Sequence, residues 1–220
     1  MFKRLKRSLM KKSDEKLSFA LILVLRIVVG LAIFLATYEQ RWMVVFVSSL
    51  TFVLTFMPRL LEHKYNFDIP PEFEMVMVLF IYASIFLGEV HGYYTRFWWW
   101  DAILHAGSAL VLGFTGFLIL YVLYRTGKFK ASFRVLALFS FCFAFALGAF
   151  WEIFEFFMDS VFGLNMQKNG IVDTMEDLMV DAIGAGIASI SGYIYLKKKE
   201  SFILSELLKR FERRNPRLFR

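Results

Sequence analysis

The chain lacks the features of several common protein classes. It has one cysteine, Cys142, and four prolines among 220 residues. One cysteine excludes a disulfide within the chain and a zinc site built on cysteines. The sequence also has no His-Glu-x-x-His motif, no Gly-x-Ser-x-Gly elbow and no phosphate-binding Gly-rich loop with lysine. Its chemistry must therefore come from other residues.

Apolar residues are abundant instead. They make up 58% of the chain, including 27 phenylalanines, whereas a soluble domain averages roughly 45–50%. The third apolar run is uncharged only from Met75 to Gly88. A span needs about 20 residues, so we expect this helix to continue through Glu89, His91 and Tyr93. The sequence predicts an all-α, polytopic membrane protein, a bundle of about six transmembrane helices. The runs are about 17–38, 42–61, 75–93, 101–124, 133–162 and 177–196.

Basic residues predict the orientation. The two chain ends and two of the connections carry 22 Lys and Arg, and the other three connections carry three. This bias predicts that both termini are cytoplasmic and that the protein lies in the inner (cytoplasmic) membrane. Because the basic residues fall in the predicted cytoplasmic segments, they do not indicate nucleic-acid binding. We expect a basic segment at 1–16, a membrane domain at 17–196 and a basic amphipathic tail at 197–220. The apolar faces of both chain ends suit interfacial helices held by anionic lipids, and solvated flanks are at least as good an interpretation for the N-terminal one.

Acids and histidines gather at the predicted outer ends of four helices. Ionisable groups inside a bilayer are costly and indicate a functional site. Residues at i, i+4 share a helix face and lie roughly 6 Å apart along it. We therefore expect His105, Glu155 and Asp177 in one layer, Glu152 and Asp181 deeper, and Asp101, Asp159 and Asp173 at the rim. The four stretches are Glu89 with His91, Asp101 with His105, Glu152 with Glu155 and Asp159, and Asp173 with Asp177 and Asp181.

Carboxylates crowded in a low-dielectric pocket cannot all stay ionised unless protons or a cation join them. Oxygen ligands with imidazole suit Mg²⁺, Mn²⁺, Zn²⁺ or Fe²⁺, so we predict a divalent-metal site. Asp101 would orient His105, and Arg26 or Arg96 would bind an anionic group. The candidate metal ligands are His105, Glu152, Glu155, Asp173, Asp177, Asp181, Glu89 and His91. The candidate catalytic residues are Asp101, His105, Glu155 and Asp177.

Each assignment has a structural alternative. Asp101 and Asp173 both suit helix capping, and Glu152 and Glu155 suit buried ion pairs with Arg26 or Arg96. Glu89 and His91, at i, i+2, cannot share one face of a regular helix. Three functions stay open: a metal-dependent hydrolase or transferase acting on a lipid-linked substrate, a cation- or proton-coupled transporter, and a non-catalytic, metal-stabilised accessory protein.

These motifs also resemble a known family. Glu89-Val-His-Gly-Tyr-Tyr, Trp100-Asp101-x-x-x-His105, Trp151-Glu-Ile-Phe-Glu155 and Asp173-Thr-x-x-Asp177 followed by Ile183-Gly-Ala resemble the YjdF-like inner-membrane proteins. The resemblance covers about residues 85–190. More distantly, the order of motifs is similar to VanZ-like proteins, which are associated with glycopeptide resistance. The resemblance implies fold and motif placement, and no particular reaction.

Overall fold

A computed structural model describes residues 2–168, 170–198 and 204–219, with side chains from Lys16 onward. All regular structure in these residues is helical, and six helical segments are long and apolar enough to cross a membrane. The all-α prediction with six spans is therefore confirmed, whereas the orientation of the termini stays a prediction. The spans are Lys16–Tyr38, Trp42–Tyr65, Pro71–Val90, Trp100–Arg125, Phe133–Phe162 and Ile171–Lys198.

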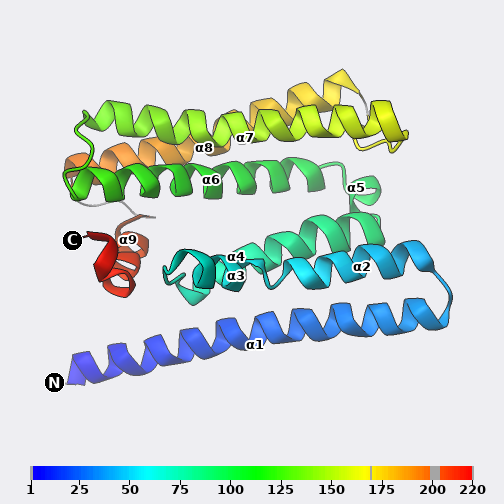
Figure 1. The fold of residues 1–220 in the computed structure, drawn as a ribbon, viewed down its shortest axis with the longest axis horizontal. Coiled ribbons are helices and arrows are strands. Elements are labelled where there is room, and N and C mark those ends of the chain that lie inside the picture. The colour runs from blue at the N-terminus through cyan, green and yellow to red at the C-terminus, as the bar shows by residue number, and fades with distance from the viewer. Residues whose placement is uncertain (1, 169, 199–203, 220) are drawn as a thin grey trace. The chain divides into compact units, whose positions relative to one another are not determined.

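The chain divides into two compact units, Met1–Trp98 and Trp99–Arg220, and each is described by itself. In Figure 1 the ribbon is coloured by residue number, so each unit can be traced along the chain. The first unit contains α1 (Phe2–Tyr38), α2 (Trp42–Leu54), α3 (Met57–Tyr65), α4 (Pro71–Ile81), the π-helix η1 (Tyr82–Val90) and α5 (Tyr93–Arg96). The second contains α6 (Trp100–Arg125), α7 (Phe133–Phe162), α8 (Ile171–Lys198), α9 (Leu204–Arg214) and the 3₁₀ helix η2 (Pro216–Phe219).

The second span is broken rather than continuous. α2 ends at Leu54 and α3 begins at Met57, with Pro58 in its first turn. Proline lacks the N–H that a carbonyl four residues earlier would accept, so it favours a break in the helix at this point. Arg26 donates to the Thr55 carbonyl at 2.6 Å and to Thr55 Oγ1 at 3.1 Å. This arginine therefore satisfies backbone that the break exposes within a span.

The third span begins and ends earlier than expected. Its helix starts at Pro71, becomes a π-helix at Tyr82 and ends at Val90. The expectation that it continues through Glu89 is correct, but its extension through His91 and Tyr93 is wrong. Gly92 adopts the left-handed conformation (φ 66°), and a separate short helix follows. The span gains its length at the other end, because Pro71 suits the first position of a helix.

Helices α6, α7 and α8 pack on one another and form the body of the second unit (Figure 1). Small residues bring them close: a Cβ added at Gly113 would lie only 2.5 Å from the Ala188 Cβ, so no larger residue fits there. Two serines bond across helices, because Ser140 donates to the Gly113 carbonyl and Ser189 to the Ala137 carbonyl, both at 2.7 Å. Such small and hydroxylated residues are what helix contacts inside a membrane favour.

The tail helix α9 packs against the second unit near the C-terminal ends of α6 and α8. Its residues Leu204 and Leu208 belong to a buried hydrophobic cluster that also contains Leu120 and Leu196. The expected lipid-facing apolar surface is therefore wrong for α9, because protein covers it. The corresponding N-terminal segment lies outside the residues whose side chains are described.

Candidate functional site

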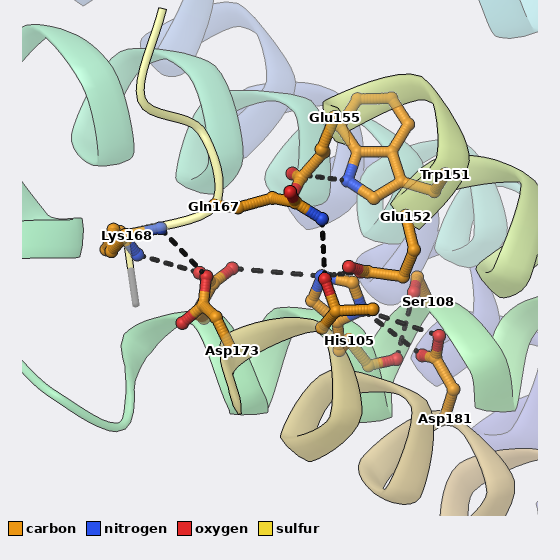
Figure 2. A network of polar contacts seen from close by, with 11 residues as sticks. His105, Ser108, Trp151, Glu152, Glu155, Gln167, Lys168, Asp173 and Asp181 are labelled. Atoms are coloured by element: carbon orange, nitrogen blue, oxygen red, sulfur yellow. Dashed lines mark hydrogen bonds and ion pairs between the residues drawn. The ribbon is translucent and has the colours of Figure 1, made fainter. Parts of the chain in front are cut away.

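An acidic cluster surrounds His105 where the first turns of α6 and α8 meet the later turns of α7 (Figure 2). The imidazole is 7% exposed. Its Nε2 lies 3.8 Å from Asp101 Oδ1 and 3.7 Å from Glu152 Oε1. Its Nδ1 lies 3.4 Å from both carboxylate oxygens of Asp181. One histidine thus contacts carboxylates from all three helices.

Asp177 joins Asp101 and His105 in a group whose ligand atoms lie close together. One ligand atom from each of Asp101, His105 and Asp177 lies within 4.8 Å of the others. Asp177 lies one helical turn before Asp181, and both carboxylates are buried. Two oxygen donors and one imidazole nitrogen at such spacing form a set that a hard or borderline divalent cation accepts.

Two carboxylates of the cluster are incompletely satisfied. Glu152 is 4% exposed and Asp181 is 0% exposed. Neither oxygen of Glu152 accepts a hydrogen bond from the residues that the structure describes, and the same holds for Asp181 Oδ1. Buried polar atoms without partners are costly and rare in native proteins. This deficit is a second, independent indication that the cluster binds a ligand.

Glu155 and Asp173 lie at the edge of the cluster and have partners of their own. The Trp151 indole donates to Glu155 Oε1 at 2.8 Å (Figure 2). The Lys168 backbone N–H donates to Asp173 Oδ2 at 3.1 Å. Asp173 is the third residue of α8 and binds the loop before the helix, so it does not act as an N-cap. Its role as a metal ligand stays a prediction.

Asp159 anchors the loop between α7 and α8. Its carboxylate accepts the backbone N–H groups of Asn165, Met166 and Gln167 at 2.8, 2.6 and 2.8 Å. Sequence reasoning places Asp159 at the rim, and the structure gives it a definite structural role there.

No role in the site is expected from the sequence for three residues near the cluster: Lys168, Gly148 and Trp151. Lys168 Nζ lies 2.7 Å from Asp101 Oδ2. A Cβ at Gly148 would lie 2.8 Å from Asp181 Cγ, so a larger residue would displace that carboxylate. The i, i+4 spacing of Trp151 and Glu155, and of Gly148 and Glu152, is a usable signal. No such signal exists for Lys168, because a loop determines where its side chain goes.

The remaining predicted residues lie in the first unit. Glu89 is in η1, and His91 is the C-cap of that helix, with its ring 4.9 Å from the Phe86 ring. Arg96 ends α5, and Arg26 contacts Thr55 as described above. The proposed roles of these residues at the acidic cluster stay predictions.

Comparison with known proteins gives a family. A family described as "Predicted membrane protein (DUF2238)" matches residues 19–198. The chain belongs to this family. An uncharacterized protein of Thermotoga maritima is 28% identical over 195 residues, which cover 88% of this chain and 96% of the relative. No solved structure matches. The DUF2238 match identifies an integral membrane protein but assigns it no activity.

Proposed function

We propose that this DUF2238 protein binds a divalent cation in the acidic cluster of its second unit. One observation carries the proposal: ligand atoms of Asp101, His105 and Asp177 lie within 4.8 Å of one another beside buried carboxylate oxygens that have no hydrogen-bond partner among the described residues. A divalent cation would compensate charges that the surrounding residues leave uncompensated. With ligands of oxygen and imidazole nitrogen, Mg²⁺, Mn²⁺, Zn²⁺ or Fe²⁺ would be suitable.

The contacts of His105 suggest how the ligands divide their roles. Metal-binding histidines usually bond a carboxylate through the second ring nitrogen, which fixes the ring orientation. Asp181 contacts Nδ1 and is placed for this role, while Nε2 faces Asp101 and Glu152. In this assignment Asp101 becomes a ligand, and Asp181 takes over the orienting role first expected of Asp101.

We propose further that the site acts on a lipid-linked substrate. The charge bias predicts that the helix ends beside the cluster lie at the outer face of the cytoplasmic membrane, on the side from which a headgroup would approach. A bound cation would polarise a phosphoryl oxygen or activate water for hydrolysis or transfer. Glu155, which the Trp151 indole holds at the edge of the cluster, is placed to accept a proton.

The transport alternative has less support. A cation or proton path would need polar groups through the other half of the unit. There, α6 contributes Phe114, Phe117 and Leu120 to a hydrophobic cluster. An accessory protein would bind the metal equally well but turn over no substrate. Of the two resemblances, the YjdF-like one agrees with the DUF2238 match, and the VanZ-like one stays a prediction.

The first experiment measures metal in the purified full-length protein. After dialysis against Mn²⁺, elemental analysis is expected to find about one ion per chain. Asp177→Asn removes a ligand charge and should weaken Mn²⁺ binding at least about tenfold. Glu176→Gln is the matched control, because Glu176 is exposed on the same helix, and it should bind like the natural sequence. Absence of metal, together with unfolding that is unchanged by chelator, would overturn the proposal.

A second experiment separates catalysis from accessory binding. The Mn²⁺-loaded protein is incubated with vesicles that contain a polyprenyl phosphate or diphosphate, and mass spectrometry follows the lipid. Metal-dependent product that Asp177→Asn abolishes supports the enzyme. Metal binding without conversion of either lipid favours the accessory function.

A further inference from the structure

A lysine ammonium lies at the edge of the acidic cluster. Lys168 Nζ is 2.7 Å from Asp101 Oδ2, while the other oxygen of the same carboxylate faces His105 at 3.8 Å. Asp101 also belongs to the group of three ligand atoms that lie within 4.8 Å of one another. The carboxylate that would bind a metal is therefore already in an ion pair with a cation of the chain itself.

The position of Lys168 does not depend on its ammonium group. Its own backbone N–H donates to Asp173 Oδ2, and the preceding N–H groups bind the Asp159 carboxylate. The Gln167 side chain bonds Thr174 Oγ1 at the start of α8. Because these contacts hold the loop, a change confined to the end of the Lys168 side chain should leave the backbone in place.

The charges around the cluster make this ammonium significant. Glu152, Glu155, Asp177 and Asp181 are buried, and His105 faces two of them, Glu152 and Asp181. Lys168 adds a positive charge at the rim, which offsets part of the repulsion among the acids. A divalent cation bound by Asp101 would lie close to this ammonium and be repelled by it. The two cations should therefore compete for one carboxylate.

We propose that Lys168 is a tethered competitor of the bound metal. Its ammonium occupies the rim of the acidic cluster when no divalent cation is present and weakens divalent binding when one arrives. Lys168 thus sets the concentration at which the site fills. This inference rests on the proposed metal site, which it deepens by giving the site a regulator.

The test compares Lys168→Met with Lys168→Arg and the natural sequence in the full-length protein. Mn²⁺ affinity is measured by isothermal titration calorimetry, with Lys128→Met in the exposed α6–α7 connection as the matched control. Close charge pairs couple strongly, so Lys168→Met should bind Mn²⁺ about tenfold more tightly. Lys168→Arg and Lys128→Met should remain within about twofold of the natural sequence.

The unfolding temperature gives a second readout, because the effect of Lys168→Met on it should differ between chelator and Mn²⁺. In chelator, Lys168→Met should unfold at a lower temperature than the natural sequence, because the acids lose a counter-charge. In saturating Mn²⁺ its gain in unfolding temperature should exceed that of the natural sequence. Lys168→Arg should show neither effect, whereas a loop that is merely disrupted would lower the unfolding temperature under both conditions.

The outcomes separate the two proposals. Equal Mn²⁺ affinity in Lys168→Met and the natural sequence overturns the competition and leaves the metal site standing. Weaker binding in Lys168→Met also overturns it, since that result would make Lys168 a supporting residue. Absence of Mn²⁺ binding in every variant overturns both the competition and the metal site.

Discussion

Each unit buries a polar cluster, and the two clusters differ in how far their own residues satisfy them. In the first unit, Glu74 Oε1 lies 3.0 Å from Arg59 Nε and 3.9 Å from Arg26, which also bonds Thr55. In the second unit, the buried Glu152 has no hydrogen-bond donor among the described residues. A buried cluster whose members satisfy one another supports the fold, whereas one with more buried acids than counter-charges indicates a ligand.

The largest effect should come from removing the shared carboxylate of the first unit. Glu74→Gln keeps the shape but leaves Arg26 without its counter-charge at a site where the arginine side chain is 11% exposed. Breaking a buried pair in this way costs about 3 kcal/mol or more of unfolding free energy. Denaturant titration in detergent micelles measures it. A loss well below this value would mean that the first cluster is not held by its charges.

The matching change in the second unit should have the opposite sign. Asp177→Asn removes one charge from a group that has too many of the same sign. In chelator we expect it to raise the free energy of unfolding by up to about 1 kcal/mol. In saturating Mn²⁺ the natural sequence should become the more stable protein. A destabilised Asp177→Asn in chelator would show that the second cluster is as self-sufficient as the first.

Acid should remove the metal-dependent part of the stability. A cation present at about 100 times its dissociation constant adds about 2.7 kcal/mol. Metal ligands must be deprotonated, so protons compete and the gain is largest at higher pH. Between about pH 7.5 and about pH 5 the difference between Mn²⁺ and chelator should shrink. A difference that stays constant over this range would argue against carboxylate and imidazole ligands.

Another change tests the close packing around Asp181. Gly148→Ala would push a Cβ against that carboxylate, whereas a Cβ at Gly186 or at Gly30 meets nothing within 4 Å. Overpacking of this kind costs about 1–3 kcal/mol, and Gly148→Ala should also weaken Mn²⁺ binding. Alanine at Gly186 in the second unit or Gly30 in the first should gain up to about 1 kcal/mol. If alanine changed the free energy of unfolding equally at all three positions, close packing of Gly148 against the Asp181 carboxylate would be refuted.

A further effect concerns a hydrogen bond to a carboxylate at the end of the second unit away from the acidic cluster. The Tyr121 hydroxyl donates to Glu212 Oε1 at 2.7 Å and joins α9 to α6. Tyr121→Phe should cost about 0.5–1.5 kcal/mol and speed limited proteolysis of the tail. Tyr124→Phe is the control, since the Tyr124 ring packs on Phe133. Equal protection of the tail in both variants would mean that apolar packing alone holds α9.

Part of the candidate site could be predicted because helix geometry is regular. Asp101 with His105 and Asp177 with Asp181 are one turn apart, so each pair shares a face before any packing is known. The position of Lys168 could not be found in this way. Its loop is shaped by Asp159, which binds three successive backbone amides, and contacts between a side chain and loop backbone have no fixed sequence period.

The sequence by itself determined six membrane helices, because their length and apolar content are set by the thickness of a bilayer. It also determined that acids recur at helical spacing near the helix ends. Tertiary structure alone decided what these side chains meet. It directed Arg26 to the carbonyl at a helix break, placed the α9 leucines against protein and put Lys168 beside Asp101. Such choices depend on which surfaces and unpaired atoms come together when the helices pack, and residue spacing along one helix carries no record of them.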